Sequence, residues 1–179
     1  SSGSGVATSA GLCYGSLGSD TGGSIRFPSA ACGIVGVKPT WGRVSRYGVL
    51  ALAESLDHIG PMTRCAADAG IILQTIAGLD PNDPTTLSAP VPPMLEEIDQ
   101  GVHGLRIGVD ETYISGNTDP QLAESVLDGI GVLERLGAVL VKIQMPDISD
   151  YMEAFGVLCS AEAFAAHEAT FPSRRDDYG

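Results

Sequence analysis

A strand–helix–strand pattern in the second half of the chain constrains the fold more than any other sequence feature. The segments "LRIGVD" and "AVLVKIQM" have the apolar composition of strands, and between them Asp119 and Pro120 mark the start of a helix. The helical spacing continues to Gly137 through Leu122, Val126, Ile130 and Leu133. This order predicts a right-handed crossover between two parallel strands, and therefore the α/β fold class.

Three further segments have helical patterns. Small residues from Ser1 onward predict a helix that stops at Gly11, and residues 66–77 predict a second that stops at Gly78. One face of this second helix holds Ala69, Ile72, Leu73 and Ile76. A last helix begins near Asp150 and carries Phe155, Leu158, Cys159 and Phe164.

The front part of the chain, to about Arg64, is rich in turn signals, which is typical of active-site loops laid over a sheet. We interpret "GIVGVKPT" and "YGVLAL" as short buried strands or extended segments. The proline-rich "LDPNDPTTLSAPVPP" predicts a connector that crosses the surface. Residues 1–64 and 65–179 are expected to be two parts of one domain.

Charge is distributed unevenly along the chain. Residues 1–64 contain five basic and three acidic side chains, whereas residues 65–179 contain five basic and nineteen acidic ones, for a net charge of −12. A surface this acidic repels phosphate backbones, so direct binding of nucleic acid is not expected. The near-neutral, glycine-rich front part is the better place for a reaction site.

The cysteines and the apolar segments indicate in which cellular compartment the protein is expected. Cys13, Cys32, Cys65 and Cys159 are scattered, with no C-x-x-C pair and no histidine at metal-ligand spacing, so no metal site is expected. Each cysteine has apolar or small neighbours, which favours buried, reduced thiols over two disulfides. No apolar run approaches the roughly 18 residues of a membrane span. We therefore expect a cytoplasmic protein.

The stretch "GSDTGGSIRFPSAACG" places Gly22 and Gly23 directly before Ser24. Glycine reaches positive φ without steric cost, so this pair can form a concave turn whose N–H groups point at one spot. That spot suits either an anion or an oxyanion. None of the three histidines has a spacing that marks it as the base for Ser24, and Arg26 replaces the final glycine of a G-x-S-x-G elbow.

Residues 1 to about 78 resemble the amidase signature family. The stretch "SSGSGVATSAGLCYGSLGSDTGGSIRFPS" is similar to the signature region over nearly its whole length, without a gap. "CGIVGVKPTWGRVSRYGVL" and "SLDHIGPMTR" are similar to the family's downstream blocks, and the remaining residues resemble it only weakly. The resemblance implies that residues 1–179 are part of a single amidase domain, an α/β/α sandwich around a mixed central sheet.

The resemblance also implies a serine hydrolase of amides that uses no histidine. Ser24 matches the family's acylating nucleophile, and the backbone N–H groups of Thr21, Gly22, Gly23 and Ser24 match its oxyanion hole. Fixed N–H donors in comparable acyl-transfer sites are worth about 3 kcal/mol each. On this basis the glycine turn holds an oxyanion and not an anion.

The resemblance also implies a Ser-Ser-Lys triad. In this triad a second serine, held by a cis peptide, links the nucleophile to a deprotonated lysine, and these two residues together act as the base. In register this serine would lie one position before Ser1, and the lysine further upstream, so we expect a partial domain that lacks both. Ser1 could replace the second serine only through a one-residue deletion. Lys38 matches a structural block after the nucleophile and is interpreted as a support residue.

Asp20 and Arg26 flank the turn, and each has two interpretations. Either Asp20 takes part in the reaction, or its carboxylate accepts N–H bonds from its own loop. The structural role is favoured, because it is the commoner one for a carboxylate close before a glycine turn. Arg26 binds a substrate carboxylate, as its resemblance to malonamidase-like members implies, or holds the loop through backbone carbonyls. Ser29 is expected to cap the next turn. Four residues of "TWGRVSRYG" line the acyl pocket or only pack: Trp41, Arg43, Arg46 and Tyr47.

The expected function is hydrolysis of a carboxamide to an acid and ammonia or an amine, through an acyl-enzyme on Ser24 and without a metal or organic cofactor. The alternative within the family is the A-type subunit of a glutamyl-tRNA amidotransferase, which releases ammonia from glutamine for a partner. An alternative of another class is a non-catalytic module whose glycine turn binds an anion. The expected partners are a small amide substrate and either a second copy in a homodimer or the other amidotransferase subunits, with no membrane.

Overall fold

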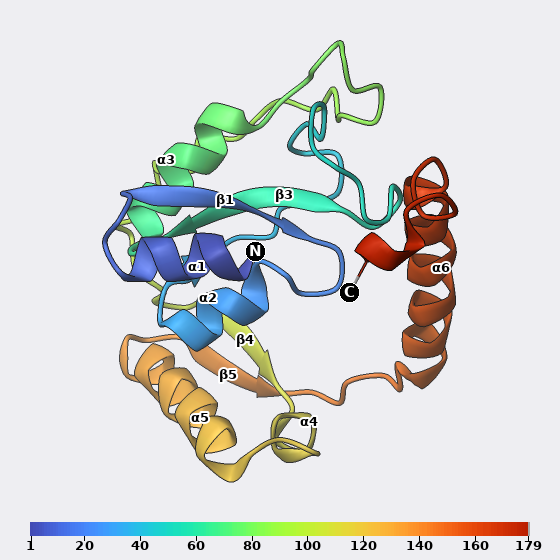
Figure 1. Cartoon of the computed structure of the whole chain (residues 1–179). Coiled ribbons are helices and arrows are strands. Elements are labelled where there is room, and N and C mark those ends of the chain that lie inside the picture. Colours follow the sequence, from blue (N-terminus) through green and yellow to red (C-terminus); the bar gives the residue numbers. More distant parts are fainter. Residues whose placement is uncertain (179) are drawn as a thin grey trace. The chain divides into compact units, whose positions relative to one another are not determined.

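The computed structural model describes residues 1–178, which form helices and two small sheets (Figure 1). Two compact units are present: Ser1–Glu96 together with the segment from Tyr151 onward, and Glu97–Asp150. These borders do not coincide with the one drawn at Arg64 from the sequence, and the single amidase domain stays a prediction. The elements of the first unit are α1 Ser2–Ser9, β1 Gly15–Asp20, α2 Arg26–Cys32, β2 Val35–Gly36, β3 His58–Thr63, α3 Ala66–Ile76, α6 Ser149–His167 (from Tyr151 onward) and η1 Arg175–Asp177. The elements of the second are β4 Arg106–Val109, α4 Glu111–Ser115, α5 Pro120–Arg135 and β5 Val139–Lys142.

Strand β3 is the centre of the first sheet, between β1 and β2, and both pairings are antiparallel. This strand was not predicted from the sequence, because it contains Gly60 and Pro61, two residues that weaken a strand pattern. Pro61 lacks an N–H but its carbonyl accepts the Val37 N–H at 3.0 Å. Gly60 is needed because a Cβ there would lie 2.0 Å from the Val37 carbonyl oxygen.

Helices cover both faces of this sheet. On one face, α1 lies so close to β3 that a Cβ on Gly5 would be 3.3 Å from the Met62 side chain. On the other, Leu73 of α3 packs with Ile59 and Val44 in the buried core. The predicted helices that stop near Gly11 and Gly78 are confirmed, and so is the α/β class. The layering matches the expected α/β/α sandwich, although the antiparallel and parallel strands form separate sheets in the described residues.

Of the two interpretations of "YGVLAL", a buried strand or an extended segment, the buried strand is wrong. The segment forms no strand, and Leu50 is 96% exposed. The segment begins with a turn instead, in which the Val49 N–H donates to the Arg46 carbonyl at 3.0 Å. The other expected strand, at "GIVGVKPT", reduces to Val35–Gly36.

The strand–helix–strand prediction is confirmed in the second unit. Strands β4 and β5 pair in parallel, and α5 connects them. Asp119 caps α5 as expected, since its carboxylate accepts the N–H groups of Gln121 and Leu122 at 2.9 and 3.2 Å. Helix α4 was not predicted, and Asp110 caps it through the Tyr113 N–H.

Three smaller expectations need correction. Cys65 is exposed and the other cysteines are half-buried, so the prediction of buried thiols is wrong. The proline-rich connector is not wholly at the surface, because Asp83 turns inward to accept the Arg46 N–H at 2.8 Å. Ser29 caps no turn but lies buried inside α2. Helix α6 does begin near Asp150 as predicted, and none of the described helices combines the length and apolar composition of a membrane span.

Candidate active site

Residues 21–25 form the turn that joins β1 to α2, and the turn carries Ser24. Its bend depends on Gly23, whose φ of +138° side chains rarely adopt and whose added Cβ would lie 2.2 Å from the Phe27 ring. Ser24 follows in an exposed position. Gly23 therefore has a steric reason, and the bend that it allows presents Ser24 at the surface of the first unit.

The buried side chain of Asp20 holds this turn through hydrogen bonds. Its carboxylate accepts the backbone N–H groups of Gly23, Ile25 and Arg26 at 2.7, 3.2 and 3.3 Å. The Arg26 guanidinium donates to both carboxylate oxygens at 3.0 and 2.9 Å, although half of the arginine side chain is exposed. Arg26 thus pairs with the Asp20 carboxylate, a partner that neither interpretation of the sequence included, since these were a substrate carboxylate and backbone carbonyls.

These bonds determine the charge state of Asp20. Burial by itself raises the pKa of this carboxyl, but the hydrogen bonds from the Arg26 side chain and from the Ile25 and Arg26 N–H groups outweigh it. The net effect lowers the pKa of Asp20 from 3.8 to about 2. The carboxylate is therefore ionised at neutral pH, as an acceptor of five hydrogen-bond donors must be.

The bond between Gly23 and Asp20 differs from the expected role of Gly23 as an oxyanion donor. Its N–H already points at a carboxylate 2.7 Å away, so in this structure Gly23 is a structural donor. Within residues 1–178, the N–H groups of Gly22 and Ser24 have no hydrogen-bond partner. They are free to bind an acceptor on a ligand.

None of the side chains considered as a base bonds to Ser24 in the described part of the chain. The Ser1 hydroxyl donates to the Ser19 carbonyl at 3.0 Å and accepts the Ser19 N–H at 2.9 Å. Lys38 donates to the Pro39 carbonyl at 2.8 Å. His58 lies at the start of β3, where its Nδ1 is 3.1 Å from the Asp20 carbonyl oxygen. No group of three or more His, Cys, Asp and Glu side chains in residues 1–178 could hold a metal ion.

Asp57 is a second buried carboxylate that holds the turn, and its role was not predicted from the sequence. The Thr21 hydroxyl donates a short hydrogen bond to the Asp57 carboxylate, which also accepts the N–H groups of Leu52 and Ala53. The only sequence signal for this pair would have been the strand at residues 58–63. Its antiparallel register pairs Asp20 with His58, so the next position places Thr21 beside Asp57.

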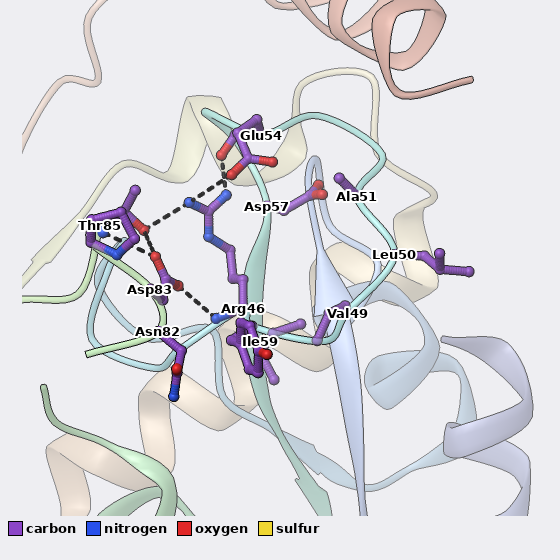
Figure 2. A pocket seen from close by; sticks show the side chains of 12 residues that line it. Arg46, Val49, Leu50, Ala51, Glu54, Asp57, Ile59, Asn82, Asp83 and Thr85 are labelled. Atoms are coloured by element: carbon purple, nitrogen blue, oxygen red, sulfur yellow. Dashed lines mark hydrogen bonds and ion pairs between the residues drawn. The ribbon is translucent and has the colours of Figure 1, made fainter. Parts of the chain in front are cut away.

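Asp57 also lines a cavity of about 290 Å³, whose surrounding side chains are drawn in Figure 2. Arg46 crosses this cavity with only 9% of its side chain exposed, donating to Thr85 at 2.9 Å and lying 3.6 Å from the Glu54 carboxylate. Its guanidinium also lies 5.0 Å from the centre of the Trp41 ring. Of the four residues expected to line a pocket or to pack, Arg46 and Tyr47 line this cavity. Arg43 instead binds the carbonyls of the connector.

Helix α6 adds two contacts to the same unit. A Cβ on Gly22 would lie 2.6 Å from the Phe155 ring, so this aromatic side chain covers one side of the serine turn. Glu162 accepts the hydroxyl and the N–H of Ser55 at 2.6 and 2.8 Å. Both hydrogen bonds lower the pKa of Glu162, and the one from the Ser55 hydroxyl has the larger effect. Gly22, the first glycine of the pair, therefore also has a steric reason.

Comparison with known proteins is consistent with this geometry. A family model described as "Amidase" matches residues 1–177. This chain belongs to the amidase family. The turn with Ser24, the Asp20 anchor and the sheet behind them all lie within the matched residues. The resemblance to the amidase signature family is thereby confirmed.

Curated members of the amidase family are similar over most of this chain. The A-type subunit of glutamyl-tRNA(Gln) amidotransferase from Synechococcus sp. (strain CC9311) is 50% identical over 92% of the chain, and that from Persephonella marina is 46% identical over 91%. These alignments cover only 34% of each relative. The chain thus spans about a third of the length of the curated relatives it matches.

Solved structures of the amidase family have the same fold. The A-type subunit of glutamyl-tRNA(Gln) amidotransferase from Thermotoga maritima matches with a TM-score of 0.85 and 43% identity, over 91% of this chain and 36% of that one. The native peptide amidase from Stenotrophomonas maltophilia matches with a TM-score of 0.78 and 36% identity, over 97% and 36%. Both similarities are high enough to assign the fold of the described residues.

Proposed function

We propose that the protein containing this chain is a serine hydrolase of carboxamides with Ser24 as its nucleophile. The observation that carries the proposal is the turn itself, in which an exposed serine follows two sterically required glycines and is anchored by a buried, ionised Asp20. Membership of the amidase family supports it. The proposal includes a cytoplasmic location and no cofactor.

In the proposed reaction, Ser24 Oγ attacks the amide carbonyl carbon while its proton passes to a base. The carbonyl oxygen becomes an oxyanion, which the N–H groups of Thr21, Gly22 and Ser24 stabilise. The C–N bond then breaks as the nitrogen accepts a proton, which leaves an acyl ester on Ser24 and releases ammonia or an amine. Water hydrolyses the ester to the acid and restores the serine. The base would be the serine–lysine relay expected upstream of these residues.

Substitution of the nucleophile tests this proposal. In the full-length protein that contains this chain, Ser24→Ala should reduce ammonia release from L-glutamine and from simple carboxamides by at least about 10³-fold, because no acyl ester can form. Covalent labelling with a fluorophosphonate should disappear as well. Circular dichroism should show an unchanged fold, since the exposed hydroxyl has no hydrogen-bond partner in residues 1–178. Retained labelling of the variant would contradict the proposal.

A second candidate keeps the chemistry and changes the role: the A-type subunit of a glutamyl-tRNA amidotransferase, which would pass ammonia from glutamine to partner subunits. The identity of 50% to a protein of this kind over 92% of this chain favours it. Preference for glutamine among the amides tested, together with copurification of partner subunits, would support this role. Equal turnover of unrelated carboxamides by a protein isolated as a homodimer would support the first candidate. Acyl labelling of Ser24 in either case would exclude the non-catalytic anion-binding module.

A further inference from the structure

Asp57 is a buried carboxylate that the proposed reaction does not use. It is 5% exposed, and none of the ion pairs within residues 1–178 includes it. Its charge is compensated by three hydrogen bonds, from the N–H groups of Leu52 and Ala53 at 2.8 and 3.1 Å and from the Thr21 hydroxyl. Burial of a carboxylate without such donors costs free energy, so the loss of any of these hydrogen bonds should be unfavourable.

The bond to Thr21 joins two segments that are 36 residues apart. One is the serine turn, and the other is the loop of residues 52–57 that leads into β3. The hydroxyl donates to a carboxylate group, and hydrogen bonds to carboxylates are about twice as strong as those between neutral groups. The β1–β3 register brings the two residues together, because Asp20 pairs with His58 at the end of the ladder.

The two carboxylates hold different halves of the turn. Asp20 binds the N–H groups of Gly23 and Ile25, in the half that leads into α2. Asp57 binds Thr21, at the opposite end of the turn. Between these anchors lies Gly22, one of the proposed oxyanion donors.

We propose that Asp57 is a positioning residue that acts through the Thr21 hydroxyl, holding the N–H groups of Thr21 and Gly22 where the oxyanion develops. This inference rests on the proposed function of Ser24. Without the bond, only the Asp20 half of the turn stays anchored. A displacement of donors by about 1 Å can cost about 10²-fold in rate. Because the oxyanion exists only after attack, the loss falls on kcat and leaves KM nearly unchanged.

Matched substitutions in the full-length protein test the inference. Thr21→Val removes the hydroxyl at constant shape and should lower kcat about 10- to 100-fold, with KM changed less than about 3-fold. Thr21→Ser keeps the hydroxyl and should restore kcat to within about 3-fold. Asp57→Asn removes the charge and should lower kcat like Thr21→Val. The double variant should be no slower than the slower single variant, because both remove the same bond.

The control is Ser45→Ala, which removes another hydroxyl–carboxylate bond of the same unit, 2.6 Å long and made to Asp80, and should leave kcat unchanged. All rates are normalised to the fraction of Ser24 labelled by a fluorophosphonate, so unfolded protein is not counted. Should Thr21→Val fail to fold, Asp57→Asn is judged by the same criteria. The inference is overturned if kcat stays within 2-fold of the unmodified protein, if Thr21→Ser is as slow as Thr21→Val, or if the two losses multiply.

Ser24→Ala separates this inference from the proposed function. An active Ser24→Ala variant refutes the function and the inference with it. An inactive Ser24→Ala variant beside a fully active Thr21→Val variant refutes the positioning role alone.

Discussion

At the scale of the residue, the Asp20 carboxylate determines how the serine turn responds to acid. Its pKa is about 2 in the folded protein against an ordinary value of 3.8, so ionised Asp20 stabilises the fold above pH 4 and this contribution is lost as the pH falls toward 2. The shift corresponds to about 2 kcal/mol of the free energy of unfolding. Asp20→Asn should therefore be less stable at pH 6, and the difference from the unmodified protein should shrink by about that amount at pH 2.

Urea denaturation at pH 6, 4 and 2 measures this difference. Comparison of the two proteins at each pH cancels the acid response of the other carboxylates. A difference that is constant over this range would contradict the role given to the ionised Asp20.

At the scale of the element, the cap of α5 is a local feature with a local energy. Asp119 binds two N–H groups at the start of this 16-residue helix, and Pro120 occupies the first turn. Asp119→Ala should lower the free energy of unfolding of the Glu97–Asp150 unit by about 1 kcal/mol, because both N–H groups lose their acceptor.

Hydrogen exchange of the amides in the first turn of α5 measures that loss. The matched control is Asp128→Ala, the same substitution at an exposed position inside the helix, where alanine is at least as good a helix former. Equal protection in the two variants would show that the cap contributes nothing.

At the scale of the whole molecule, no side chain within residues 1–178 forms a hydrogen bond with the hydroxyl of Ser24, the proposed nucleophile. Neither Ser1 nor Lys38 bonds to Ser24, and the curated relatives are about three times as long as the matched region. Residues 1–179 expressed by themselves should therefore show no appreciable amide hydrolysis, while the full-length protein should be active. Exposed apolar side chains such as Leu50 and Tyr14 should also make the isolated chain prone to aggregate.

Ammonia release and size-exclusion chromatography of both proteins measure these two properties. The matched control is the full-length Ser24→Ala variant, which keeps the remainder of the protein but not the nucleophile. Turnover by residues 1–179 at the rate of the full-length protein would refute the need for an upstream base.

The sequence by itself determined the features that depend on neighbouring residues. The parallel unit around α5 followed from apolar spacing and from the cap at Asp119, and both features lie within a few residues of the helix they specify. The serine turn followed from two adjacent glycines. Such signals can be read directly because their interactions are local.

Only the tertiary structure decided which distant segments meet. Thr21 and Asp57 are 36 residues apart, and Arg46 and Thr85 are 39 apart. Their contacts depend on the register of β3, whose Gly60 and Pro61 obscure the strand pattern. The hydrogen bond from the Gly23 N–H to Asp20 likewise depends on how the turn folds over the carboxylate. Strand pairing over long separations is specified by packing on both faces of the sheet, which no local pattern contains.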